Sequence, residues 1–150
     1  MSGSTARSVF AKSLLKDVAP VEIEFFEAYD ATASDVDSRR RAGTGMGLPP
    51  EVAGVLGMVA VIVGRTVFDK LSEWAISIGG EIVKKFLVDS GVQRLKKWLK
   101  APENSSLAGV LTAEGRREVL AVVERDARAA KLKPEELDKL LKSVAARLDS

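Results

Sequence analysis

The sequence contains neither cysteine nor histidine. Disulfide bridges, thiol nucleophiles, imidazole general bases and zinc sites built from thiolate or imidazole ligands are therefore excluded. Any catalysis would have to use carboxylates, lysines, hydroxyl groups or the single tyrosine, Tyr29. The lack of cysteine does not identify a compartment, because it suits both a reducing cytosol and a secreted protein that needs no disulfides.

A strong excess of one charge is also missing. The chain of 150 residues has 23 Lys and Arg against 21 Asp and Glu, which gives a net charge of +2. Proteins that bind duplex nucleic acid usually carry a much larger basic excess, so we expect no nucleic-acid partner. The hydrophobic share of 46% and the charged share of 29% are typical of a globular protein.

The sequence also lacks a long hydrophobic segment. Its longest uncharged run is VAGVLGMVAVIVG at residues 52–64. As a helix, this run would span roughly 20 Å at about 1.5 Å per residue, against a hydrocarbon core of about 30 Å. Three interpretations stay open: a buried central helix, an interfacial or re-entrant element, and a tight helix–helix contact. We favour the buried helix.

Small residues recur at helical spacing within this run. They lie three or four positions apart, which places them on one face of a helix. A stripe of small side chains lets a neighbouring backbone approach closely. The predicted helix-contact face consists of Ala53, Gly57, Ala60 and Gly64.

The N-terminal region, residues 1–47, predicts a helix followed by less regular structure. Ser4 or Thr5 can cap a helix that carries Phe10, Leu14 and Val18 on one face and ends before Pro20. Charged residues interrupt its apolar positions, so we predict no secretory signal. We expect a cytoplasmic protein, with a peripheral membrane location as the alternative.

Two further segments complete this region. Residues 21–25 (VEIEF) alternate as a half-buried strand would, although a helix that starts with Pro20 is the alternative. Residues 31–47 combine small, charged and Gly residues without either period, so we predict a flexible connection. Arg39, Arg40 and Arg41 form a basic knot within it, which is usually solvated.

The central region, residues 48–101, predicts the core. After Arg65, the residues 67–78 form an amphipathic pattern, and Gly79 and Gly80 mark a helix end or a hinge. Residues 81–100 predict a basic amphipathic segment of the kind found on membrane surfaces or against acidic partners, although basic residues also stabilise a helix C-terminus. The candidate face for an anionic membrane or an acidic partner comprises Trp74, Lys84, Lys85, Arg94, Lys96, Lys97, Trp98 and Lys100.

The C-terminal region, residues 107–150, predicts a helical hairpin. One helix opens near Thr112, and the second opens at Pro134 with apolar residues at Leu137, Leu141 and Val144. Each helix has a single apolar face, so the hairpin needs a third surface to cover it. That surface is either the central helices of the same chain or another protein.

No motif predicts an enzyme. The carboxylate pairs Glu22/Glu24, Asp35/Asp37 and Glu135/Glu136 lie in polar neighbourhoods, whereas general acids need desolvated pockets. Ser13 and Lys16 have the spacing S-x-x-K without its partner motifs. We therefore expect no catalytic residue, no metal, no cofactor and no small-molecule substrate.

Two stretches resemble groups of bacterial proteins. The run GLPPEVAGVLGMVAVIVG with the Trp-bearing, Lys-rich segments after it, over about residues 47–100, resembles saposin-like helical bacteriocins, which implies membrane activity. Asp69, Glu73, Asp89 and the charged C-terminal region depart from that pattern. Residues 21–64 are similar to small effector-associated components of bacterial conflict systems. Neither resemblance assigns a role to a residue.

The sequence thus predicts a mainly α fold: a helical bundle with an apolar central helix, a C-terminal helical hairpin and at most one short N-terminal strand. The leading hypothesis is a non-enzymatic interaction or assembly module that works through helix packing with a protein partner or a second copy. The alternative is a membrane-active or membrane-associated helical protein that opens at the glycine hinge and inserts into an anionic membrane.

Overall fold

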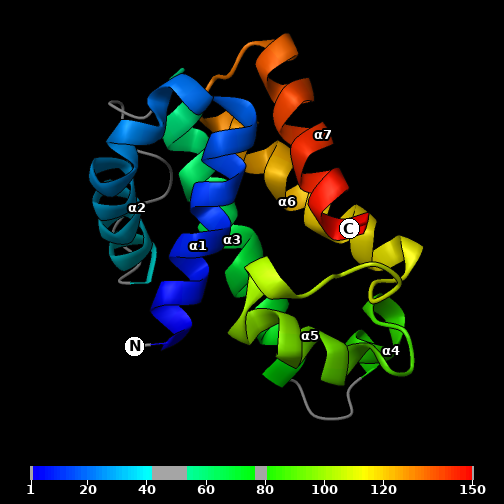
Figure 1. Ribbon diagram of the computed structural model, residues 1–150. Helices are drawn as coiled ribbons and strands as arrows, with labels where there is room; N and C mark the ends of the chain where they lie inside the picture. Colours follow the sequence, from blue (N-terminus) through cyan, green and yellow to red (C-terminus); the bar gives the residue numbers. More distant parts are fainter. Residues whose placement is uncertain (1, 42–53, 77–80, 150) are drawn as a thin grey trace.

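The computed structural model describes residues 2–41, 54–76 and 81–149, and these residues form a bundle of helices without a strand (Figure 1). An isolated antiparallel bridge joins Leu87 to Leu111. The predicted mainly α bundle is confirmed. The elements in chain order are α1 (Ser2–Val18), the 3-10 helix η1 (Pro20–Phe25), α2 (Phe26–Arg41), α3 (Leu56–Ile76), α4 (Glu81–Phe86), α5 (Gly91–Lys100), the 3-10 helix η3 (Pro102–Asn104), α6 (Ala113–Ala129) and α7 (Pro134–Asp149).

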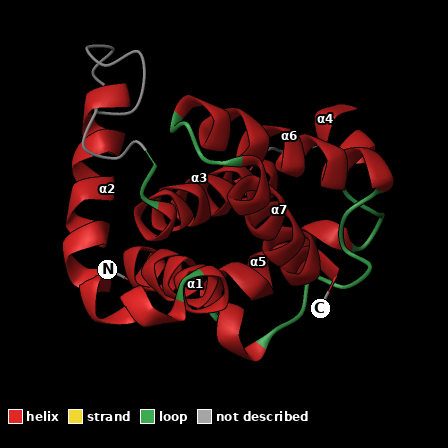
Figure 2. Cartoon of the chain, turned by 90° about the horizontal axis from the view of Figure 1, so that it is seen from above, coloured by secondary structure: helices red, strands yellow, loops and turns green. Residues whose placement is uncertain are grey.

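Helix α3 lies in the middle of the bundle, with α1, α2, α5 and α6 packed around it (Figure 2). From Val59 to Val63 no side chain is more than 1% exposed. A helix that is apolar on all sides is stable only when it is covered on all sides, and here the same chain covers it. Within the described ranges, no helix has the length and apolarity needed to cross a membrane.

Helix α1 makes the most extensive contact with α3. Phe10, Leu14 and Val18 recur every fourth residue and are almost fully buried, at 3%, 0% and 1% exposure. The helix ends at Val18, two residues before Pro20, whose ring cannot continue a helix without losing a hydrogen bond. The predicted first helix and its apolar face are confirmed, but the predicted cap is wrong, because α1 already includes Ser2 and so contains Ser4 and Thr5.

Residues 21–25 form the 3-10 helix η1, so the predicted strand is wrong. Pro20 fixes the backbone for a helical first position, and the amide of Glu22 donates to the carbonyl of Ala19 at 2.9 Å. A strand also needs a neighbouring strand for its hydrogen bonds, and the described residues offer none. The helical alternative that starts with Pro20 is the one that the structure adopts.

The predicted flexible connection at residues 31–47 is wrong for its first part, because α2 continues to Arg41. Ala33 and Val36, three residues apart, are each 1% exposed and belong to the core. This short apolar stripe anchors a helix that is otherwise polar. Arg39 to Arg41 therefore lie in a helix rather than in a loop. Residues 42–53 lie outside the described residues, and with them the glycines at 43, 45 and 47.

The apolar run and the amphipathic pattern after Arg65 form one continuous helix, α3, up to Ile76. Within the described residues, the helix begins only at Leu56. Gly54 precedes it with a positive φ of 76°, a conformation that glycine adopts without strain. Gly79 and Gly80, the predicted hinge, lie outside the described residues.

Residues 81–100 form two helices rather than one segment. Helix α4 ends at Phe86 and α5 begins at Gly91. Between them the chain pairs with residues 110–112: Val88 donates to Val110 at 3.0 Å, and Thr112 donates to Phe86 at 2.9 Å. A side chain at Gly91 would lie 2.9 Å from the carbonyl oxygen of Val110, so this pairing requires glycine there.

The C-terminal hairpin of α6 and α7 is present as predicted. The Thr112 hydroxyl accepts from the amide of Gly115 at 3.1 Å and caps α6, while the Glu136 carboxylate accepts from the amide of Lys133 at 3.2 Å before α7. Helix α6 packs on α3 and α7 packs on α1. The third surface that the hairpin requires therefore comes from the same chain.

Candidate functional site

The small-residue face of α3 lies against other elements of the chain. A Cβ on Gly64 would lie 2.8 Å from the Cα of Ala11, so α1 crosses α3 at this point with backbone contact. A Cβ on Gly57 would lie 2.6 Å from Glu22 Oε1 and 2.9 Å from the ring of Tyr29. Ala60 is fully buried, and Ala53 lies outside the described residues. Within one copy, this face is already occupied.

Polar side chains also form an ion pair and a hydrogen bond where α3 packs against η1 and α2. Arg65 is 4% exposed, and its Nη1 lies 2.9 Å from Asp30 Oδ1. Tyr29 donates to Glu22 Oε1 at 2.6 Å. Burial raises the pKa of Tyr29 to about 12, with further contributions from the hydrogen bond and the negative charge of Glu22. The phenol is therefore a neutral donor at physiological pH.

The two tryptophans of the predicted membrane or partner face are both 3% exposed, so they lie in the core and not at the surface. Trp98 packs between Phe10 and Phe68, with ring centroids 5.1 Å and 5.6 Å away. Trp74 stacks on Phe86 at 4.7 Å. Their helices need these large apolar side chains to attach to the bundle, because an aromatic residue contributes more buried area than any other.

The cations of that predicted face are exposed. Helix α5 lies at one end of the bundle (Figure 1). It buries Leu95 and Trp98, and its basic residues are exposed. We call Lys96, Lys97 and Lys100 the α5 basic face. Gln93 and Arg94 are exposed beside it, and α5 contains no acidic residue.

Some cations near this face have structural partners. Arg94 donates to the carbonyl oxygens of Ala108 and Gly109 and ties α5 to the following loop. Lys85 lies 3.6 Å from Glu114. For Lys84 and the three residues of the α5 basic face, no carboxylate among the described residues lies within ion-pair distance. The sequence-predicted cations thus divide into an engaged and a free group.

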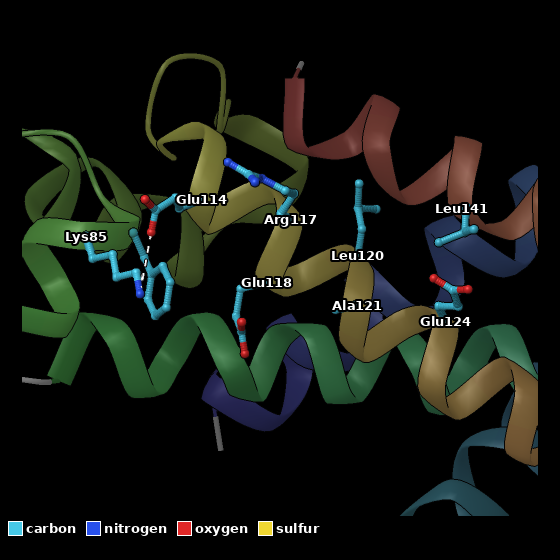
Figure 3. A pocket seen from close by; sticks show the side chains of 9 residues that line it. Lys85, Glu114, Arg117, Glu118, Leu120, Ala121, Glu124 and Leu141 are labelled. Carbon is cyan, nitrogen blue, oxygen red and sulfur yellow. Dashed lines mark ion pairs between the residues drawn. The ribbon is translucent and has the colours of Figure 1, made fainter.

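An open groove of about 600 Å³ lies along α6 (Figure 3). Phe86, Leu120, Ala121 and Leu141 supply its apolar walls. The rim is charged, and most of its charges have partners: Glu114 pairs with Lys85, Glu118 with Lys70 and Glu124 with Arg128. Because these ion pairs are already made, the rim does not indicate the charge of a ligand.

A second pocket, of about 350 Å³, lies between α1, α5, η3 and α7. Phe10 and Trp98 form its aromatic wall, and Glu103 and Arg147 supply charge. Arg147 is held by Asp17, whose Oδ2 lies 2.7 Å from Nη2. The pocket is therefore partly closed by an existing ion pair.

The groups considered for catalysis are not gathered in either pocket as a set. Ser13 Oγ donates to the carbonyl of Phe10 at 2.7 Å, while Lys16 is exposed. Glu22 is engaged with Tyr29, Glu24 is exposed, and Glu136 caps a helix. A search of the described residues finds no group of acidic side chains that could hold a metal ion.

Comparison of the chain with protein-family models, curated proteins and solved structures finds no match.

One surface feature is missed by the sequence pattern. Val21 is 85% exposed and Phe25 is 49% exposed, both on η1. The alternating pattern predicted that these two side chains face a core. A 3-10 helix repeats every three residues, so the inward face of the predicted strand is not kept.

Proposed function

We propose that this chain is a non-enzymatic interaction module that binds an acidic protein surface through the α5 basic face. The observation that supports the proposal is the composition of that face: exposed lysines, no carboxylate on the same helix, and no ion-pair partner among the described residues. Cations elsewhere in the bundle do have such partners: Arg7, Arg65 and Arg147 each form an ion pair with an aspartate.

The α5 basic face is held rigidly. Leu95 is fully buried and Trp98 is enclosed by two aromatic rings, so the helix cannot roll to hide its lysines. Lys96 and Lys100 are four residues apart, and Lys97 and Lys100 are three apart. Like charges at these spacings cost roughly 0.2–0.5 kcal/mol per pair. A partner carboxylate removes this repulsion and gains a charge-assisted hydrogen bond.

An anionic membrane offers the same charge, but the structure supports it less. The large exposed apolar side chains of the described residues are Val21, Phe25 and Ile76, and none of them is on α5. Without an apolar anchor, three lysines contribute about 1 kcal/mol each at an anionic surface. Stable membrane attachment usually needs a second signal, such as an apolar anchor, beside charges of this kind.

The proposal is tested with poly-L-glutamate as an acidic polypeptide probe. Its binding to the full chain is measured by fluorescence anisotropy at low salt. The variant Lys96→Glu/Lys97→Glu/Lys100→Glu is compared with Lys16→Glu/Lys133→Glu/Lys139→Glu, which changes three exposed lysines elsewhere and alters the net charge equally. We expect the α5 variant to bind about tenfold more weakly or worse, since each ion pair contributes up to about 1 kcal/mol.

Two outcomes contradict the proposal. Equal losses in both variants would mean that the probe reads net charge and not the α5 basic face. Flotation with vesicles that contain phosphatidylserine, if it depends on the same lysines while poly-L-glutamate does not bind, would favour the membrane alternative. Circular dichroism of each variant establishes that the helical content is unchanged.

A further inference from the structure

The charges of this chain are segregated along the sequence and in space. From Val18 to Ser38 the chain contains several carboxylates and no Lys or Arg, whereas α5 contains basic residues and no acid. In the structure the acidic segment forms η1 and α2 up to Ser38, before the three arginines that end α2, on one side of α1 and α3, and α5 lies on the other side (Figures 1 and 2). The two surfaces therefore cannot meet within one copy.

The exposed part of the acidic segment is also apolar. Glu22 and Asp30 are engaged with Tyr29 and Arg65, but Glu24 and Glu27 are exposed. Between and beside them lie the exposed side chains of Val21 and Phe25. We call Val21, Glu24, Phe25 and Glu27 the η1 patch.

The packing of its own chain covers the η1 patch only in part: the ring of Phe25 lies 6.1 Å from that of Tyr29, centroid to centroid, and Val21 stays exposed. No residue of η1 is buried, although three of its side chains are large and apolar; of these, Ile23 packs partly against the core, and Val21 and Phe25 are exposed. Exposed apolar groups that lie together and are rimmed by charge mark interaction surfaces. The composition of the patch, apolar with carboxylates, is the complement of a helix that presents lysines beside apolar side chains.

Helix α5 has this composition. Val92 and Leu99 are half-buried and, seven residues apart, lie together along one border of the α5 basic face. Lys96 and Lys100 lie within one turn of Leu99, so the alkyl parts of these lysines extend the apolar border. The two surfaces thus match in charge and in the presence of apolar contacts.

Resting on the proposed function, we propose that the acidic surface bound by the α5 basic face is the η1 patch of a second copy of this chain. Glu24 and Glu27 meet the lysines of α5, and Val21 and Phe25 pack beside them. The contact is head-to-tail, because different surfaces of the two copies meet. Such contacts produce closed rings or open chains.

The test is the mass of the full chain by sedimentation equilibrium at several protein concentrations. At low salt we expect the mean mass to rise with concentration above that of the monomer, and to return to the monomer at high salt, because salt screens exposed charges. The variant Lys96→Glu/Lys97→Glu/Lys100→Glu alone and the variant Glu24→Lys/Glu27→Lys alone should each remain monomeric, since like charges then face each other.

A mixture of these two variants is the decisive sample. The first keeps a native η1 patch and the second keeps a native α5 basic face, so the mixture restores one native contact and creates one with both charges reversed. We expect heteromeric association in the mixture only. A mixture that stays monomeric, when the wild-type chain associates, would overturn the head-to-tail contact.

The apolar part of the patch is tested separately. Val21→Ser/Phe25→Ser should weaken association, whereas Ile76→Ser, which changes another exposed apolar residue at 74% exposure, should leave it unchanged. A wild-type chain that stays monomeric at all concentrations and low salt would overturn this inference. If it still binds poly-L-glutamate through α5, the proposed function survives; if that binding is also lost, both proposals fail.

Discussion

Helices α3 and α5 differ in how much of their surface the chain itself covers. The apolar side chains of α3 are buried by α1, α2, α5 and α6, and its small residues lie against the backbone of α1 and the side chains of η1 and α2. Helix α5 is covered on one face only, and its other face presents lysines without a partner among the described residues. The exposed, unpartnered face of α5 therefore indicates a binding surface better than the apolar residues of α3 do.

The polar groups of α3 extend this contrast. Arg65 pairs with Asp30, Asp69 with Arg7, and Lys70 with Glu118. These partners come from α2, α1 and α6, so each neighbour is attached by both apolar and charged contacts. On α5, Arg94 alone has such a contact, to backbone carbonyls. Substitutions in the covered and in the exposed parts of these helices test this difference.

The largest effect is expected at the covered face of α5. Trp98→Ala removes the ring that lies between Phe10 and Phe68, and truncation of a buried Trp costs about 3–5 kcal/mol. Chemical denaturation followed by far-UV circular dichroism measures the loss. Gln93→Ala, at an exposed position of the same helix, serves as the control. A Trp98→Ala loss as small as that of the control would mean that α5 is not anchored by its aromatic side chain.

The second prediction concerns the close crossing of α3 and α1. Gly64→Ala places a methyl group 2.8 Å from the Cα of Ala11, where the backbone cannot yield cheaply. Overpacking of this kind costs about 1–3 kcal/mol, and the higher helix propensity of alanine offsets about 1 kcal/mol of it, so we expect a net loss of up to about 2 kcal/mol. Thermal unfolding checks the result.

Gly57→Ala is the matched control for Gly64→Ala. Its new methyl group meets the far end of the Glu22 side chain at 2.6 Å and the ring of Tyr29 at 2.9 Å, which are side chains that can shift, and no backbone atom. We expect a smaller loss of stability than at Gly64. Equal melting temperatures for the two variants would show that the crossing at Gly64 is looser than its distances indicate.

The third prediction concerns the cap that connects α6 to α4. Thr112 Oγ1 accepts from Gly115 N at 3.1 Å and donates to Lys85 O at 2.6 Å. Thr112→Ala should cost about 1 kcal/mol, in the range of measured N-cap losses. Thr112→Ser keeps the hydroxyl and should recover most of the stability. Failure of serine to rescue would assign the loss to the methyl group instead.

The fourth prediction concerns the cover of α3 near Gly57. The pKa of Tyr29 is raised to about 12 from an ordinary value of about 10. Because the folded state binds this proton more tightly, its contribution to stability is complete below about pH 10 and is lost as the pH rises toward 12. The effect is small, since solvent screens a partly exposed group. Ultraviolet absorbance follows this titration directly, because the chain has one tyrosine.

Glu22→Gln separates the causes of this pKa shift. Burial is the largest cause, and the hydrogen bond and charge of Glu22 add to it. The substitution should therefore lower the pKa of Tyr29 without returning it to the ordinary value. A complete return would show that the carboxylate, and not burial, dominates.

The smallest effect on stability is expected at the free face of α5. Lys96→Gln/Lys97→Gln/Lys100→Gln removes exposed charges that repel each other, so the free energy of unfolding should change by no more than about 0.5 kcal/mol per residue, and in the stabilising direction. The measurement is a melting curve at low salt. A large loss of stability would mean that these lysines stabilise the folded state and are not a free binding surface.

The elements with a clear period could be predicted from the sequence. Helix α1 is indicated by apolar residues at every fourth position, Phe10, Leu14 and Val18. The start of α6 is indicated by its capping residue, Thr112. Both signals are local in the sequence. The C-terminal hairpin follows for the same reason. The predicted small-residue spacing of Gly57, Ala60 and Gly64 also lies on α3, although the sequence alone left open which surface it meets.

The wrong predictions fall where the local pattern is short or weak, or where a segment distant in the sequence decides the structure. In residues 21–25 the alternation is compatible with a strand, and no neighbouring strand is present to form one. In α2 the stripe of Ala33 and Val36 is too small to stand out from a polar segment. The break between α4 and α5 depends on pairing with residues 110–112, which lie more than twenty positions away.

The candidate site was predicted in its residue types and not in its arrangement. The lysines of α5 are exposed as a basic amphipathic pattern suggests, but Trp74 and Trp98 belong to the core. A tryptophan among lysines has the same sequence signature whether it faces a membrane or a neighbouring helix. The exposed Val21 and Phe25 had no signal of their own, since exposure depends on what the rest of the chain leaves uncovered.

The sequence by itself determined that this protein is a helical bundle without thiol or imidazole chemistry, because composition and local period decide which elements form and which side-chain reactions exist. The tertiary structure alone decided which faces remain open. Burial is a property of pairs of surfaces distant in the chain, so only the packed bundle shows that α3 is covered on all sides from Val59 to Val63 and that α5 keeps a cationic face toward solvent.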